Sequence, residues 1–240
     1  MKNGTGNISA ILFDKDGTLL DFDATWEPAY RETSLFAARG DRTLADRLLE
    51  ETGMDLASGK SAAGSLLAAG NSAEIAAAWI ACGADFQEGA LTADLDRVFV
   101  GCMHDAATLP GIPAAVETLS ETGFTLGVAS SDSEAAIRAF LAGTGLAPRF
   151  AFVTGYDTGF GPKPKPGMVH GFAEATSLVP DRIAVVGDNT HDMEMARSAG
   201  AGLCIGVLTG TSARHDLNAL ADVVLDSVAD LPAYLAGTPA

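Results

Sequence analysis

The sequence predicts an α/β fold in which a doubly wound parallel sheet is interrupted by an inserted all-helical segment. Short apolar runs with strand character alternate with helical patterns from Phe124 onward, as in parallel sheets whose strands are joined by helices. A similar run, Ile8–Phe13, stands alone near the start of the chain. Between them, from Asp23 to about Ala107, we find helical spacing and no convincing strand.

The chain length is compatible with this division into two parts. With 240 residues, 48% of them hydrophobic, the chain can form one large domain or two small ones with a sizeable core. We expect an α/β core of residues 1–21 and 109–240. A helical domain of residues 22–108 is expected to be inserted into that core.

The first predicted strand, Ile8–Phe13, is short, β-branched at its start and apolar throughout, as buried parallel strands are. It stops at two carboxylates, Asp14 and Asp16, which Gly17 and Thr18 follow. Ligands of open α/β sheets bind at the carboxyl ends of the strands. The pair can therefore supply a nucleophile and a proton donor to one reacting centre, and Asp is an established nucleophile in phosphoryl transfer.

Two other interpretations of Asp14–Leu20 compete with a catalytic loop. Asp-Gly is a strong hairpin signal, so the segment could be a plain turn between two strands. Asp-x-Asp also opens calcium-binding loops, which require Gly at the sixth position and Glu at the twelfth. Those positions hold Leu19 and Thr25, which excludes the calcium loop. The choice between turn and catalytic loop depends on the rest of the chain.

The insert has several helical patterns. Trp26 and Tyr30 fall near one helical face, Ser72 can cap an Ala-rich helix, and Asp94–Met103 again has helical spacing. The pattern ends before the Pro110-Gly111 turn. Since the insert follows directly on the carboxyl end of the first strand, we interpret it as a lid over that end.

Lys60 is the lysine of the insert, and it lies in its most Gly- and Ser-rich loop, Gly53–Asn71. With the lid closed, a cation there could bind a carboxylate or second phosphate at the distal end of a substrate. The alternative is a solvated surface lysine, as most lysines are. Lys60 is thus a candidate substrate-binding residue.

Strands and helices alternate after the insert. Flanking glycines and runs of apolar residues with either strand or helix spacing define these elements. The predicted strands are Phe124–Ala129, Phe150–Thr154, Arg182–Gly187, Leu203–Val207 and Val223–Leu225, and the predicted helices are Asp132–Gly143, Pro166–Leu178 and Thr190–Gly200.

Polar residues follow two of these strands. Ser130 and Ser131 end the second strand, and their hydroxyls can donate to phosphate oxygens; alternatively, Ser131 or Asp132 caps the next helix. After the third strand, Pro162–Pro166 contains Lys163 and Lys165, two of the five lysines in an acidic chain. Prolines on both sides of a lysine restrict its backbone, which favours a functional ammonium group.

The fourth strand ends in Gly187 and Asp188, and Asp192 falls in the first turn of the next helix. Asp in a first turn is common because it interacts favourably with the helix dipole. Asp188 facing Asp14 across neighbouring strands is costly unless a cation lies between them. Mg²⁺ fits, because it prefers hard oxygen ligands and binds beside substrate phosphates.

Charge limits the range of partners. The formal net charge of −16 argues against nucleic acid and against anionic membranes. No stretch approaches the roughly 18 apolar residues of a membrane span, and Met1–Ala10 lacks the apolar core of a secretory signal. We expect a cytoplasmic monomer or homodimer that binds a small phosphorylated metabolite.

The four polar segments, in order, resemble the four motifs of the haloacid dehalogenase superfamily. They are Asp14-Lys-Asp16-Gly-Thr18, the strand ending in Ser130, Lys163-Pro-x-Pro, and Gly187-Asp188-x-x-x-Asp192. The insert resembles the C1 cap of that superfamily, and the chain is most similar to its phosphoglycolate phosphatase-like and sugar-phosphatase-like branch. The resemblance implies a Rossmann-like core with a helical cap.

The resemblance also implies a role for each matched residue. Asp14 attacks phosphorus to form an aspartyl-phosphate, and Asp16 protonates the leaving oxygen and then activates water. The expected ligands of Mg²⁺ are the Asp14 carboxylate, the Asp16 carbonyl, Asp188 and Asp192. Among the remaining candidates, Ser130 and Lys163 bind phosphoryl oxygens, Ser131 lies next to them, and Thr18 supports the nucleophile loop.

An acid at position 16 favours hydrolysis of phosphate esters, because an alkoxide leaving group needs a proton. We expect a Mg²⁺-dependent phosphoric monoester hydrolase for a phosphoglycolate-like or sugar-phosphate-like substrate. A phosphomutase of the β-phosphoglucomutase type shares every motif and is the first alternative. The second is a non-catalytic binding domain on the same fold. The four histidines have no metal-binding spacing, and we interpret them as surface or structural residues: His104, His170, His191 and His215.

Overall fold

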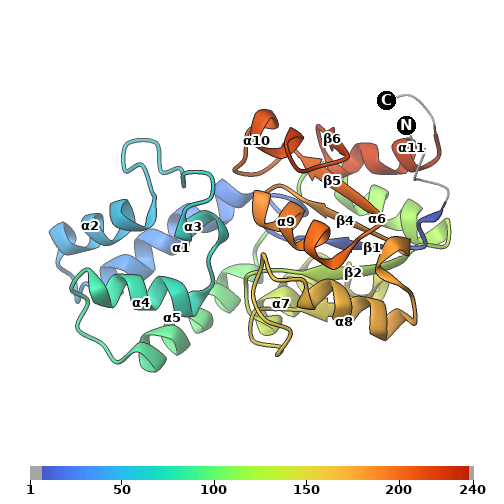
Figure 1. Ribbon diagram of the computed structural model, residues 1–240. Coiled ribbons are helices and arrows are strands. Elements are labelled where there is room, and N and C mark those ends of the chain that lie inside the picture. Colours follow the sequence, from blue (N-terminus) through green and yellow to red (C-terminus); the bar gives the residue numbers. More distant parts are fainter. Residues whose placement is uncertain (1–6, 238–240) are drawn as a thin grey trace.

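The sheet is six-stranded and parallel throughout, with strand order β3-β2-β1-β4-β5-β6 (Figure 1). The computed structural model describes residues 7–237. Helices cover both faces of the sheet, which confirms the predicted doubly wound α/β fold. The strands are β1 (Ala10–Phe13), β2 (Thr125–Ala129), β3 (Phe150–Thr154), β4 (Ile183–Gly187), β5 (Leu203–Val207) and β6 (Val223–Leu225).

The apolar runs are explained by burial on both faces of the sheet. On β1, Ile11 and Phe13 belong to a hydrophobic cluster on one face, whereas Ala10 and Leu12 belong to a second cluster on the other. Successive side chains of a strand point to opposite faces, so a strand covered on both sides needs apolar residues at every position.

The helices of the sheet region were only partly predicted. The three expected helices are present, and each is shorter than predicted by one to three residues. Three further helices were not predicted: two have only five residues, too few for a helical period to show, and the third, Ile112–Glu121, has ten residues and was missed. The helices of this region are α6 (Ile112–Glu121), α7 (Glu134–Gly143), α8 (Gly167–Thr176), α9 (Thr190–Ala199), α10 (Arg214–Asn218) and α11 (Leu231–Leu235).

Of the six helices between β1 and β2, the first five form the left part of the molecule in Figure 1, whereas α6 packs with the sheet region. We call these five the inserted helices: α1 (Phe22–Ala37), α2 (Arg42–Thr52), α3 (Leu66–Ala69), α4 (Ser72–Ala81) and α5 (Glu88–Met103). The entering and leaving chains meet where Leu20 pairs with Thr108, and where the Leu109 amide donates to the Leu19 carbonyl at 3.0 Å. These contacts lie next to the predicted domain boundaries, 21/22 and 108/109, which stay a prediction. Residues 1–6 and 238–240 of the predicted core lie outside the described part.

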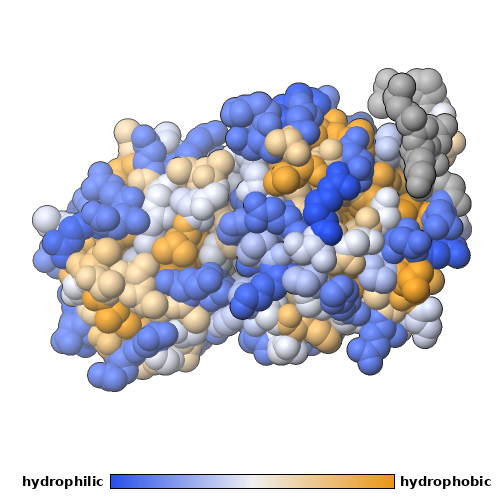
Figure 2. Space-filling model, viewed as in Figure 1, coloured by the Kyte–Doolittle hydropathy of each residue, from blue (hydrophilic) through white to orange (hydrophobic). Residues whose placement is uncertain are grey.

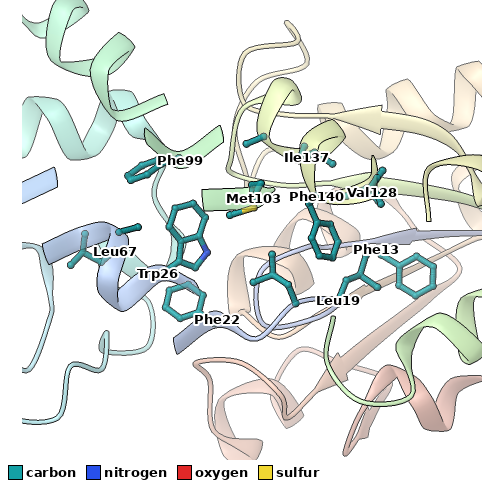
Figure 3. Close-up of a cluster of buried hydrophobic side chains, with 14 of the residues drawn as sticks. Phe13, Leu19, Phe22, Trp26, Leu67, Phe99, Met103, Val128, Ile137 and Phe140 are labelled. Atoms are coloured by element: carbon teal, nitrogen blue, oxygen red, sulfur yellow. The ribbon is translucent and has the colours of Figure 1, made fainter. Parts of the chain in front are cut away.

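A continuous hydrophobic cluster joins the inserted helices to the sheet (Figure 3). The inserted helices contribute Trp26 and Phe99 to this cluster, and the sheet region contributes Phe13 and Phe140. Met103 lies between the two groups. All five side chains are buried. The inserted helices therefore pack directly against the sheet region, at β1 and α7.

The outer surface is mixed in character. On the face seen in Figure 2, hydrophilic side chains are spread over both parts of the molecule, and hydrophobic ones occur in small groups between them. Among residues 7–237, no helix combines the length and the apolar composition needed to cross a bilayer.

Candidate active site

The polar segments meet because β1 lies between β2 and β4. Phe13, the last residue of β1, aligns with Val128 on β2 and with Val186 on β4. Since the strands are parallel, the residues that follow them emerge at the same edge of the sheet, which brings Asp14 next to Asp188. This is the juxtaposition that the sequence predicted.

The turn after β1 is real, but the hairpin interpretation is wrong, because the chain leads into α1 and β1 pairs only with β2 and β4. Gly17 has φ +76°, and a Cβ there would lie 2.7 Å from the Gly210 Cα and 2.9 Å from the Asp188 Cγ. A side chain is excluded by both backbone conformation and space. Thr18 donates its hydroxyl to Asp188 Oδ1 at 3.4 Å, so it links this loop to the end of β4.

Three buried carboxylates, Asp14, Asp188 and Asp192, offer oxygen atoms that all lie within 4.8 Å of one another. Lys163 donates to Asp14 Oδ1 at 2.6 Å and to Asp192 Oδ1 at 2.5 Å. The loop with three prolines, Pro162–Pro166, thus places Lys163 at the strand ends. One ammonium group faces three carboxylates, so the cluster retains excess negative charge.

Electrostatics of this cluster favour a bound cation. Burial raises the pKa of Asp14 to about 7, although the Lys163 ammonium opposes this rise. Burial is the main reason why the pKa of Asp188 lies well above its usual range, and the nearby Asp14 carboxylate raises it further. For Lys163, burial alone would lower the pKa, but Asp14 and Asp192 raise it overall. A divalent cation among the carboxylates would relieve their repulsion, and oxygen ligands suit Mg²⁺.

Asp192 has a structural role as well as a place in the cluster. The Asn189 side chain caps α9. In return, Asp192 Oδ2 accepts from the backbone N–H of Asn189 at 3.1 Å, which completes a capping box. A Cβ on Gly187 would lie 2.2 Å from Asp192 Oδ2, so only glycine permits this approach. The helix cap therefore fixes the carboxylate that Lys163 binds.

A loop that the sequence did not select also holds Asp188. The Thr211 amide donates to Asp188 Oδ2 at 2.9 Å, and the Thr209 hydroxyl donates to the Gly17 carbonyl at 2.6 Å. Both threonines follow β5, next to β4 in the sheet. Polar residues after this fifth strand were the available signal, since Asp14, Ser130 and Asp188 each directly follow a strand.

The side chain of Asp16 lies apart from the three clustered carboxylates. Its Oδ1 accepts from Lys15 Nζ at 2.6 Å and from the Trp26 indole at 2.7 Å, and its Oδ2 accepts from the Ser130 hydroxyl at 3.0 Å. The two carboxylates after β1 thus occupy different environments. Asp14 faces a cation-binding cluster, whereas Asp16 faces hydrogen-bond donors, one of them on an inserted helix.

The serines after β2 make specific contacts. Ser130 is fully buried and also accepts from the Asp132 amide at 3.1 Å, while Ser131 donates to the Ala69 carbonyl on α3 at 3.0 Å. Neither Ser131 nor Asp132 caps α7, because Ser133 does, accepting from the Ala136 amide. Phosphate binding by Ser130 and Ser131 stays a prediction.

A cavity with about 540 Å³ of empty volume, its mouth included, separates the strand ends from the inserted helices. Lys60 does not line it: its ammonium lies 3.4 Å from Asp23 Oδ2, and its side chain is 70% exposed. His191 does line the cavity. In the sequence, only its position between Asp188 and Asp192 indicated this. The remaining lining comes from the motif residues Asp14, Asp16, Ser131, Asp132, Lys163, Asp188, Asn189 and Asp192, and from residues of the inserted helices.

Comparison with known proteins identifies the family. The family model of haloacid dehalogenase-like hydrolases matches residues 8–200, which is most of the chain. The chain belongs to this family. The resemblance inferred from the four motifs is thereby confirmed.

Individual proteins similar to this haloacid dehalogenase-like hydrolase include one that is named a probable phosphatase. The probable phosphatase IndB of Dickeya dadantii is 36% identical over 51% of this chain, but the match spans only 53%, about half, of its own length. The protein CbbY of Cereibacter sphaeroides is 31% identical and covered to 94%, over 93% of this chain. The crystal structure of CbbY from Rhodobacter sphaeroides in complex with phosphate has a TM-score of 0.70 at 26% identity, covering 93% of this chain and 96% of that one.

Lys15, between the two motif carboxylates of this haloacid dehalogenase-like hydrolase, is a residue that the sequence reasoning missed. It is fully buried, and its ammonium lies 2.6 Å from Asp16 Oδ1 and 3.2 Å from Asp132 Oδ2. It also contacts the Met103 sulfur at 3.3 Å and the Trp26 ring, whose centroid is 5.2 Å away. The available signal was the position of Lys15, a charged residue that closely follows an entirely apolar strand.

The Lys15 ion pairs should contribute strongly to stability. Lys15→Met removes a buried cation and leaves Asp132 with an uncompensated charge, although burial already raises the pKa of Asp132 to about 6. We expect the free energy of unfolding to fall by about 3–5 kcal/mol, the scale for breaking a buried ion pair from one side. Urea denaturation followed by circular dichroism measures this change.

Two further variants make this measurement specific. Lys15→Met combined with Asp132→Asn should recover much of the loss, since no unpaired charge then remains at Asp132. Lys60→Met removes a lysine whose partner, Asp23, is at the surface, and should change stability little. Equal losses for Lys15→Met and Lys60→Met would contradict the role of the buried pair.

Proposed function

We propose that the protein is a Mg²⁺-dependent phosphatase that hydrolyses small phosphate monoesters through an aspartyl-phosphate at Asp14. The observation that carries this proposal is the separation of two carboxylates after β1. Asp14 lies in a buried cluster with Lys163, and Asp16 lies beside it among hydrogen-bond donors. Family membership and the name of the relative IndB support a phosphatase rather than a binding domain.

Asp14 would supply the attacking oxygen. The Lys163 ammonium, 2.6 Å from Asp14 Oδ1, favours the ionised carboxylate against the effect of burial. Asp14, Asp188, Asp192 and the Asp16 carbonyl would hold Mg²⁺, which supplies positive charge to a transferring phosphoryl group when bound. As Asp14 bonds to phosphorus, the bond from phosphorus to the ester oxygen breaks.

Asp16 would handle the protons of both steps. In the first step, its protonated form gives a proton to the leaving oxygen, which departs as an alcohol. In the second step, the Asp16 carboxylate takes a proton from water, whose oxygen bonds to phosphorus as the bond to Asp14 breaks. Inorganic phosphate and free Asp14 result. Ser130, Lys15 and Trp26 all donate to Asp16 in this structure, which orients its carboxylate for the second transfer. The first transfer needs a proton on Asp16, so at least one of these donors would have to turn away from it.

Dependence on metal tests this proposal. Exhaustive chelation should abolish turnover of 4-nitrophenyl phosphate, and added Mg²⁺ should restore it, because repulsion among the clustered carboxylates disfavours a further anion in the absence of a cation. Circular dichroism of the chelated protein controls for loss of fold. Full activity after complete metal removal would refute the proposal.

A further inference from the structure

The inserted helices are docked onto the sheet region in this structure. Side-chain hydrogen bonds cross between the two parts: Trp26 to Asp16 Oδ1 at 2.7 Å, Ser131 to the Ala69 carbonyl at 3.0 Å, and Tyr156 to Asp96 Oδ2 at 2.9 Å. Lys15 also donates to the Met103 sulfur on α5 at 3.3 Å. The wall that these helices present to the cavity is therefore the one that a bound substrate meets opposite Asp14.

That wall is mostly aromatic and aliphatic, with Asn71 and Ser72 at the start of α4 as its uncharged polar members. Trp26 stacks on Tyr30 with ring centroids 5.4 Å apart and an interplanar angle of 18°, and Phe99 meets Trp26 edge to face at 4.9 Å. The polar tips of two rings are already bound within the protein, because the Trp26 indole donates to Asp16 and the Tyr30 hydroxyl donates to the Leu67 carbonyl at 2.7 Å. Figure 3 shows Phe22, Trp26, Leu67 and Phe99 in one group.

The charges that line the cavity are almost all negative. Five aspartates and one lysine, Lys163, lie in its wall, and that lysine is bound to Asp14 and Asp192. Several cations of the inserted helices form pairs elsewhere: Lys60 with Asp23, Arg31 with Glu27, Arg39 with Asp85, and Arg97 with Asp94. Within the part of the chain that the structure describes, no lysine or arginine of the inserted helices lines the cavity.

We propose that this site selects phosphate monoesters whose alcohol portion is uncharged, and that it rejects substrates that carry a second anionic group. The inference rests on the proposed phosphatase function. The apolar wall can cover a carbon skeleton, but a distal carboxylate or phosphate would lose water there without gaining a cation. Sugar monophosphates meet this requirement, whereas phosphoglycolate and bisphosphates do not.

Substrate pairs that differ only in the distal charge test the proposal. The first pair is 2-hydroxyethyl phosphate and phosphoglycolate, and the second is benzyl phosphate and 4-carboxybenzyl phosphate, each assayed with Mg²⁺. We expect kcat/KM to be about tenfold or more higher for the uncharged member of each pair, with most of the difference in KM. A preference for the charged members would overturn this inference alone. Absence of turnover with all four compounds would overturn the phosphatase proposal and this inference with it.

A charge placed in the wall provides an independent measurement. Ala69 is half-buried and lines the cavity, so Ala69→Lys adds a cation there, and Ala69→Gln is a matched uncharged control. For each substrate pair, we compare kcat/KM for the charged compound with kcat/KM for the uncharged one. Ala69→Lys should raise this ratio by about fivefold relative to Ala69→Gln. A wild-type preference for the charged compounds that disappears in Lys60→Ala would instead assign distal recognition to Lys60 and refute the proposal.

Discussion

Asp14→Asn is expected to lower kcat by about 10⁵-fold or more while the protein stays folded, because an amide cannot form the acyl-phosphate bond. The same change removes one of the three buried carboxylates clustered within 4.8 Å. In metal-free protein we therefore expect the variant to be at least as stable as the wild type, since repulsion with Asp188 and Asp192 is relieved. Steady-state kinetics and urea denaturation measure the two effects separately.

Asp226→Asn is a matched control, because this aspartate is 81% exposed and pairs with Arg214 at the surface. It should leave kcat unchanged. Acid quenching with radiolabelled substrate should detect covalent phosphate on the wild-type protein and none on Asp14→Asn. Covalent phosphate on the variant would assign the nucleophile to another residue.

Asp16→Asn should produce a loss that depends on the leaving group. For alkyl phosphates, whose leaving oxygen needs a proton, we expect kcat to fall by about 10²–10⁴-fold, the usual contribution of a general acid. For aryl phosphates with acidic phenols the loss of phosphoryl transfer should be much smaller, and the aspartyl-phosphate should accumulate because water is no longer activated. The slope of log kcat against leaving-group pKa, with burst kinetics, measures both effects.

The Asp16→Asn experiment needs a control for the loss of the hydrogen bonds that Asp16 accepts. Asp16 accepts hydrogen bonds from Lys15, Trp26 and Ser130, so the amide of Asp16→Asn changes the local packing as well as the acid. Trp26→Phe removes one donor but keeps Asp16, and should lower kcat less and without a steeper leaving-group slope. If Asp16→Asn lowered turnover equally for every leaving group, Asp16 would not be the proton donor.

The sequence alone was sufficient for the architecture and for much of the cluster of carboxylates at the strand ends. Apolar runs bounded by turn residues identified all six strands, because strands covered on both faces leave a local signal. Once the strands are parallel, residues that follow them must share one edge of the sheet. Asp14, Asp188 and Lys163 could therefore be placed together before their distances were known.

Short elements and exact ends were less accessible to sequence reasoning. Helices α10 and α11 have five residues each, too few for a helical period to show. Ser133, rather than Ser131 or Asp132, caps α7, because three adjacent polar residues can each begin a helix and backbone geometry selects one.

Only the tertiary structure decided which lysine is buried and which distant side chains contact Asp16. Lys15 and Lys60 are both lysines near aspartates in the sequence, yet one is fully buried between Asp16 and Asp132 and the other is mostly exposed beside Asp23. Lys15 meets Met103 across 88 positions of the chain, and Asp16 meets Ser130 across 114. Such contacts depend on how the inserted helices dock onto the strand ends. That docking is determined by the packing of side chains from distant segments, which no local sequence pattern records.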